Sequence, residues 1–77
     1  MSKGHRLLKA WRKRARLHQV VVATQLGISQ SYICDLERGL GMPSAPLANR
    51  IARVTRGFVP VAAWGALAKR RVKVAMA

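Results

Sequence analysis

Few side chains in this sequence could carry out catalysis or bind a metal. The candidates are His5, His18 and Cys34, with the chain's two acids, Asp35 and Glu37. One cysteine excludes an internal disulfide, and the two histidines lie far apart without a third zinc ligand, so we expect both to be solvated. Acids separated by one residue do not form an acid–base pair in a cleft. The sequence therefore predicts a protein that is not an enzyme and holds no metal or cofactor.

Charge is the chemistry that this sequence does carry. Its 77 residues include 15 Lys or Arg and 2 acids, which gives a formal net charge of +13 and a pI near 12.0. The basic residues are concentrated at 3–16, 50–56 and 69–73, around a nearly neutral centre that holds both acids. Such a charge favours a polyanionic partner. No apolar run approaches the ~18 residues of a membrane span, so we expect a cytoplasmic protein without a membrane partner.

The basic N-terminal segment has the periodicity of a helix. Over residues 5–16, Leu8, Trp11 and Ala15 fall on one face, and Arg12 lies at its border. Cations without an acid cover the opposite face, where they repel one another, so an anionic partner is expected there. These cations are Arg6, Lys9, Lys13 and Arg16.

Two short helices with a glycine between them come next. Residues 19–26 contain three consecutive valines, which favour a strand, but helical spacing gathers the buried positions on one face. We interpret this segment as a helix that ends at Gly27. Ser29 can cap a further helix that runs to Gly39. The buried positions of the first helix are Val22, Ala23 and Leu26.

The last third of the sequence predicts two more helices and a basic tail. Ser44 can cap a helix over 45–56, with Pro46 in its first turn. Leu47, Ile51 and Val54 would be its buried face. A short helix near Pro60 would bury Trp64 and Leu67. The domain is then expected over 1–68, followed by a basic tail at 69–77 that is either a short strand or flexible.

Residues 19–38 match the pattern of a helix-turn-helix motif, which is about twenty residues long. The fifth position needs a small residue where the helices cross, and the ninth favours glycine in the turn. Ala23 and Gly27 occupy these positions. Apolar residues are expected at the fourth, eighth, tenth, fifteenth and eighteenth positions, and the chain has Val22, Leu26, Ile28, Ile33 and Leu36 there.

The resemblance extends beyond the motif, from Leu8 to about Leu67. The segments LKAWRKRARLHQ, LGISQSYICDLERG, MPS and LANRIARVTRG resemble the Cro and phage-repressor (XRE-type) family, and RVTRGFVPVAAW is similar to small Cro-like and YdaS-like prophage regulators. The resemblance implies an all-α, lambda-repressor-like bundle of four to five short helices that binds operator DNA as a dimer. Val20 and Val21 depart from the family, which usually has a polar or acidic residue there. They are either tolerated apolar surface or a contact with a partner or second subunit.

The two acids should have different functions, because about 200° separates them on the helix. Glu37 lies next to the buried Ile33 and needs a cation, for which Arg12 is the candidate; a solvated Glu37 is the alternative. The family resemblance supports this pair, since an arginine and a glutamate at these places bridge the first helix to the recognition helix. Asp35 lies on the other side, where a carboxylate can accept from cytosine N4 and penalise DNA that offers no donor. It could instead be solvated at the groove edge.

The remaining candidates surround this face. We expect base contacts from Gln30, Ser31, Cys34 and Asp35, with the Gln30 amide suited to adenine. Gln19 should contact a phosphate and brace Gln30, whereas Tyr32 either contacts the DNA backbone or packs against Met42. Phosphate contacts position a protein without reading sequence. The other candidates for them are Ser29, Arg38, Lys9, Lys13, Arg14, Arg16, Arg50, Arg53 and the tail 69–73.

Together these features predict a sequence-specific transcriptional regulator of double-stranded DNA, most like a Cro-type phage repressor. It would bind a pseudo-palindromic operator as a homodimer and take no small-molecule ligand. One alternative is an antitoxin or host-interaction protein whose motif serves autoregulation. Another is a basic peptide that binds RNA or membranes without specificity. The dimer contact would involve the helix near Trp64 or residues 72–76.

Overall fold

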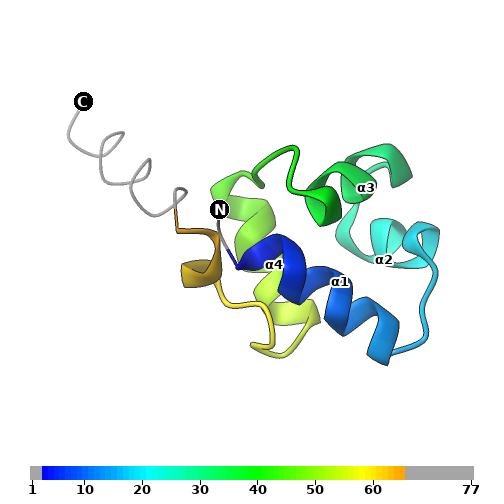
Figure 1. The fold of residues 1–77 in the computed structure, drawn as a ribbon, viewed down its shortest axis with the longest axis horizontal. Coiled ribbons are helices and arrows are strands. Elements are labelled where there is room, and N and C mark those ends of the chain that lie inside the picture. Colours follow the sequence, from blue (N-terminus) through cyan, green and yellow to red (C-terminus); the bar gives the residue numbers. More distant parts are fainter. Residues whose placement is uncertain (1–2, 66–77) are drawn as a thin grey trace.

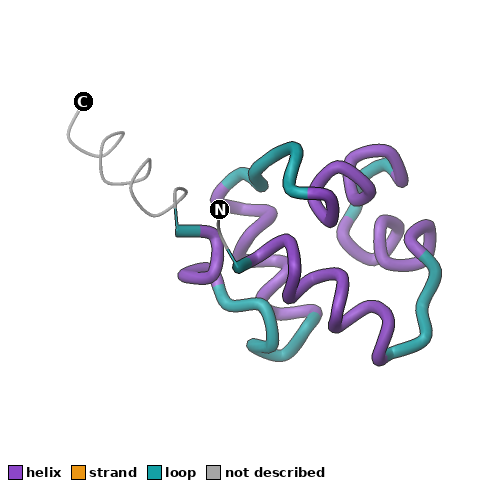
Figure 2. Tube along the Cα trace, in the orientation of Figure 1, coloured by secondary structure: helices purple, strands orange, loops and turns teal. Residues whose placement is uncertain are grey.

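The computed structural model describes residues 3–65, which form four α-helices and one 3₁₀ helix (Figures 1 and 2). As expected, the fold is an all-α bundle, and residues 3–65 contain no strand. The expected boundary at residue 68, Leu67 and the expected strand at 72–76 lie outside the described residues. The helices are α1 (Gly4–Arg14), α2 (Gln19–Leu26), α3 (Gln30–Arg38), α4 (Ala45–Val54) and the 3₁₀ helix η1 (Val61–Trp64).

Serine caps start two of the helices where the sequence predicts them. The Ser29 hydroxyl accepts a hydrogen bond from the Tyr32 N–H at 3.1 Å, and Ser44 does the same for the Leu47 N–H at 3.3 Å. Each bond satisfies one of the N–H groups that a helix start leaves without a backbone partner. The α2–α3 and α3–α4 connections are therefore fixed by local chemistry.

Each of the four α-helices ends in a left-handed residue, but the residue type differs. Gly27 and Gly39, after α2 and α3, have φ of 73° and 78°. Arg16 and Arg56, after α1 and α4, have φ of 59° and 53°. At all four ends the N–H of the following residue bonds back into the last turn, as in a Schellman motif. The predicted ends at residues 16 and 56 were therefore too late, because no glycine marks the left-handed position.

A core shared by all five helices holds the bundle together. Trp64 of η1 is fully buried and packs against α1, where a Cβ on Gly4 would overlap its indole ring. Of the residues expected on the apolar helix faces, Ala15 is exposed, because α1 ends before it, whereas Trp11 and Val54 are partly buried and pack against the core. The core comprises Leu8, Val22, Ala23, Leu26, Ile33, Leu36, Leu47, Ala48, Ile51, Val59 and Trp64.

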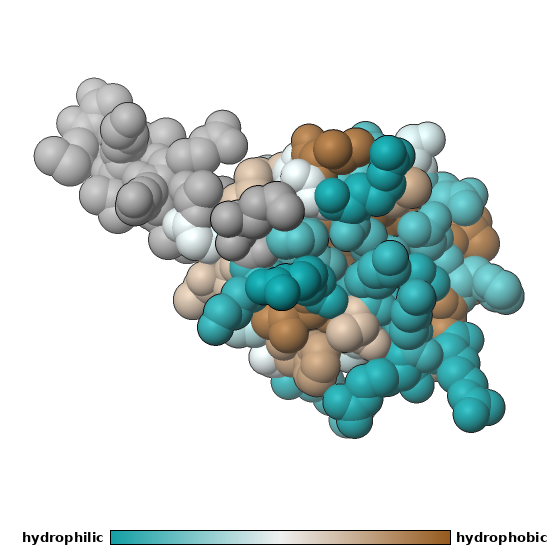
Figure 3. Space-filling model, viewed as in Figure 1, coloured by the Kyte–Doolittle hydropathy of each residue, from teal (hydrophilic) through white to brown (hydrophobic). Residues whose placement is uncertain are grey.

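One histidine belongs to the interior, contrary to our expectation. His5 is 8% exposed, and a Cβ on Gly39 would lie 3.4 Å from its Cδ2 atom. The ring therefore fills the space between the start of α1 and the end of α3. His18 is exposed, as predicted. On the surface, Figure 3 shows hydrophilic side chains over much of the viewed face, with separate apolar patches.

Candidate nucleic-acid interface

The helix-turn-helix motif is formed by α2, α3 and the turn between them. Ala23 is 2% exposed where the two helices pack, and Ile28 donates its N–H to the Ala23 carbonyl at 2.9 Å. Gly27 takes the positive φ that this turn requires, and a Cβ there would lie 3.4 Å from Arg50 Nη1. The turn thus holds α3 in a fixed position against α2.

The four predicted base-reading residues lie together on one side of α3. Gln30, Ser31 and Asp35 are exposed, and Cys34 is partly buried. With Gln19 and Arg38 they line a shallow depression of about 340 Å³. Its lining offers an amide, a hydroxyl, a carboxylate and a guanidinium, which are the groups that recognise base edges and phosphates.

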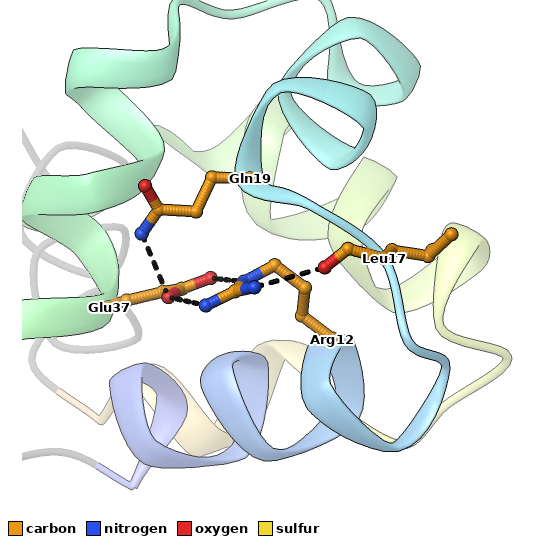
Figure 4. Close-up of polar contacts among 4 residues, drawn as sticks. All are labelled: Arg12, Leu17, Gln19 and Glu37. Carbon is orange, nitrogen blue, oxygen red and sulfur yellow. Dashed lines mark hydrogen bonds and ion pairs between the residues drawn. The ribbon is translucent and has the colours of Figure 1, made fainter.

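The ion pair predicted between Arg12 and Glu37 is present and lies behind this surface. Arg12 Nε and Nη2 donate to Glu37 Oε2 and Oε1 at 2.6 and 2.9 Å, so the contact is bidentate (Figure 4). The side chains are 14% and 2% exposed. The hydrogen bond to Glu37 raises the pKa of Arg12, against the opposing effect of burial. The pair joins α1 to α3 in surroundings that screen its charges little.

Two further bonds extend this pair into a network that the sequence did not reveal. Arg12 Nη1 donates to the Leu17 carbonyl at 3.0 Å, and Gln19 Nε2 donates to Glu37 Oε1 at 3.2 Å (Figure 4). We expected Gln19 to brace Gln30, but its amide bond within the described residues goes to Glu37. Glu37 therefore holds α1, the start of α2 and α3 in one arrangement. No periodicity or spacing in the sequence signals the bond to Gln19.

Three other candidates for phosphate contact already make hydrogen bonds within the fold. Tyr32 Oη donates to the Met42 carbonyl at 3.3 Å, which is the packing alternative. Arg50 Nη1 donates to the Leu26 carbonyl at 2.7 Å and so satisfies the end of α2. The Ser29 hydroxyl accepts the capping bond of α3. Their side chains have a structural contact, whatever else they bind.

The remaining candidates for backbone contact are surface cations. Arg14 differs from the others, because its guanidinium stands 5.7 Å from the centre of the Phe58 ring, and neither of these two residues lines the depression beside α3. Val20 and Val21 are 52% and 39% exposed at the start of α2, so they form apolar surface beside the motif. The exposed cations are Lys9, Lys13, Arg14, Arg16, Arg38 and Arg53.

The fold and this surface define a helix-turn-helix domain of the DNA-binding class. A family model described as a helix-turn-helix domain matches residues 6–63, which is most of the chain, so the protein belongs to this family. It is 41% identical over 46 residues to the "ImmF control region 10 kDa protein" of Bacillus phage phi105. That alignment covers 60% of this chain and 51% of the phage protein, so the chain matches about half of its relative. No solved structure matches it. The expected membership of the Cro and phage-repressor type is thus confirmed. No helix within residues 3–65 is long and apolar enough to cross a membrane.

Proposed function

We propose that this protein is a transcriptional regulator of phage type that binds a specific DNA operator through α3. The supporting observation is that Gln30, Ser31, Cys34 and Asp35 share one accessible surface, which we call the reading surface and which the buried Arg12–Glu37 pair supports. The control-region name of the phage relative supports a regulatory function. We place this activity in the cytoplasm, on the DNA of a bacterium or an infecting phage.

In the proposed complex α3 enters the major groove. The Gln30 amide pairs with adenine N6 and N7, Asp35 accepts from cytosine N4, and Ser31 and Cys34 contact neighbouring base edges. The Asp35 carboxylate is repelled by phosphates, so it lowers affinity for every site that gives it no donor. Asp35 therefore contributes specificity at the expense of affinity.

Phosphate contacts come from the rim of this surface. Gln19, anchored through Glu37, lies at the start of α2, and Arg38 lies at the end of α3. Lys9, Lys13 and Arg53 and the basic tail at 69–77 add charge that does not read sequence. Binding as a Cro-type homodimer to half-sites about one helical turn apart would occlude a promoter without any chemical step.

The test is selection of bound duplexes from a random DNA pool at about 150 mM salt, where binding through charge alone is weakened. We expect an enriched inverted repeat whose half-site spacing reports the distance between two α3 helices. Asp35→Ala should relax one base position of that repeat and leave the others, whereas Lys9→Ala should weaken all sequences alike. A pool that returns without enrichment would overturn specific recognition.

A second candidate, an antitoxin or host-interaction protein, is favoured by one observation. Val20 and Val21 place apolar surface at the start of α2, beside Gln19, the expected phosphate contact that lines the same depression as the base-reading residues. A protein partner bound there would cover part of the DNA surface and relieve repression. The test is co-purification of this protein with the product of a neighbouring gene. This candidate gains support if the double variant Val20→Ser/Val21→Ser abolishes co-purification and leaves the selected duplexes unchanged.

A further inference from the structure

A second depression, of about 530 Å³, lies between the end of α1 and the loop after α4. Its lining includes Trp11 and Arg14 of α1, and Thr55, Arg56 and Phe58 of the loop. Figure 1 shows this loop on the side of α1 that faces away from α3. A duplex bound along α3 would therefore leave this depression open.

The loop holds Phe58 at the surface by a fixed backbone. Thr55 is buried; its hydroxyl donates to the Ile51 carbonyl at 2.7 Å and accepts from the Val59 N–H at 3.1 Å. The Phe58 N–H donates to the Thr55 carbonyl at 3.1 Å, and the next residue, Val59, is fully buried. Phe58 itself is 36% exposed. The ring is therefore held at the surface between two anchored residues, Thr55 and Val59. Burial in the core would remove more of its apolar surface from water.

The charge of this site is positive and has no acidic side chain to balance it. Arg14 stands over the Phe58 ring at 5.7 Å from its centre, and Arg56 lines the same depression. The chain has two acids, and both are elsewhere: Asp35 on the reading surface and Glu37 bound to Arg12. A carboxylate side chain that pairs with these arginines must therefore come from another molecule.

We propose that this depression, defined by Trp11, Arg14, Arg56 and Phe58, binds an acidic peptide segment of a partner protein. An aromatic or large apolar side chain of the segment packs between Trp11 and Phe58, and flanking carboxylates pair with Arg14 and Arg56. A phosphate backbone supplies the negative charge but no side chain for the two aromatic rings. The regulator could then hold a partner on one face while its other face binds DNA. This binding does not depend on the proposed DNA function.

The experiment titrates the full chain with a capped peptide in which one phenylalanine lies between two pairs of glutamates. Binding is monitored by two-dimensional ¹H–¹⁵N NMR at about 150 mM salt, where long-range attraction is screened. We expect shifts at the Trp11 indole N–H and at Arg14 and Phe58, with Gln30 and Asp35 unaffected. A matched peptide with alanine in place of phenylalanine should bind about ten-fold more weakly, which is the range of a cation–π and stacking contribution.

Variants distinguish binding at this site from the general attraction of an acidic peptide to a basic protein. Phe58→Leu keeps apolar volume but loses the ring, and should weaken binding several-fold while the NMR spectrum stays folded. Arg14→Glu should abolish the shifts, whereas the charge-matched Lys9→Glu should reduce them only slightly.

Any of three results would overturn the proposal: equal binding of both peptides, equal effects of Arg14→Glu and Lys9→Glu, or displacement of the peptide from Trp11 by a random-sequence duplex. The last result would make the depression a phosphate-binding surface.

Discussion

The helices on the α2–α3 side of the molecule and those at the end formed by α1 and α4 end in the same backbone conformation, but with different residue types. All four α-helices end in a left-handed residue. At Gly27 and Gly39 a Cβ would lie in van der Waals contact with a neighbour, 3.4 Å from Arg50 Nη1 in one case and 3.4 Å from His5 Cδ2 in the other. Arg16 and Arg56 are exposed, so strain is the main cost of a side chain there. Glycine occupies the left-handed position where a side chain would contact a neighbour, and arginine occupies it where the side chain extends into solvent.

The two sides also differ in how they use charge. The α2–α3 side holds both acids, one buried against Arg12 and one exposed on the reading surface. The α1–α4 end has cations and exposed aromatic surface without an acid. Mixed charge suits recognition of particular base edges, whereas unbalanced positive charge beside aromatic rings suits any acidic segment with an apolar side chain. This difference in charge is the reason why the two proposed binding faces would select different partners.

The largest expected effect comes from breaking the pair that supports the reading surface. Arg12→Ala should destabilise the fold by about 3–5 kcal/mol, because it leaves Glu37 buried without its cation. Glu37→Ala should cost less, since Arg12 is more exposed than Glu37 and keeps the Leu17 carbonyl as an acceptor. Urea unfolding measures both, with the exposed Arg6→Ala as the control, which should change stability by less than about 0.5 kcal/mol.

The pH dependence of this pair follows from the direction of the Arg12 shift. Its folded pKa is raised, so the contribution of the charged arginine is complete below its ordinary pKa and is lost only as strongly alkaline solution passes the folded value. The double variant Arg12→Met/Glu37→Leu, which lacks the pair, is the control. A fall in stability near neutral pH in the wild type but not in this variant would contradict this account.

An intermediate effect is expected at the glycine that ends α2. Gly27→Ala should cost about 1–2 kcal/mol, because alanine must adopt a left-handed φ at that position. Gly41→Ala is the matched control: its φ is not positive and nothing lies within 4 Å of its Cβ position, so stability should be unchanged or slightly higher. Thermal unfolding of the two variants compares them directly, and equal losses would mean that strain at Gly27 is not the cause.

The smallest effect should have the opposite sign and lies at the α1–α4 end. Arg56→Gly relieves left-handed strain, and the gain is partly offset by the greater freedom of glycine when unfolded, so we expect at most about 1 kcal/mol of stabilisation. Arg16→Gly should behave alike. Arg56→Gly should gain stability and lose affinity for the acidic peptide. A variant that loses both would show that Arg56 has a structural role.

Much of the fold and part of the site could be predicted from residues close in the sequence. Ser29, Ser44, Gly27 and Gly39 act within one turn of their own position, so their capping functions were correctly inferred. The Arg12–Glu37 pair was also predictable, because the chain has few acids and only one of them lies on a buried helix face. The left-handed ends at Arg16 and Arg56 were missed, since no residue type there signals the conformation.

The sequence by itself determined the helices, their caps, the motif register and the excess of positive charge, because these depend on local periodicity and composition. Only the tertiary structure decided which side chains meet: Gln19 with Glu37, Tyr32 with Met42, His5 with Gly39, and Arg14 with Phe58. Each of these contacts joins different elements of the chain. Their geometry depends on how the helices cross, and that is set by close packing of the shared core around Trp64 rather than by any local pattern.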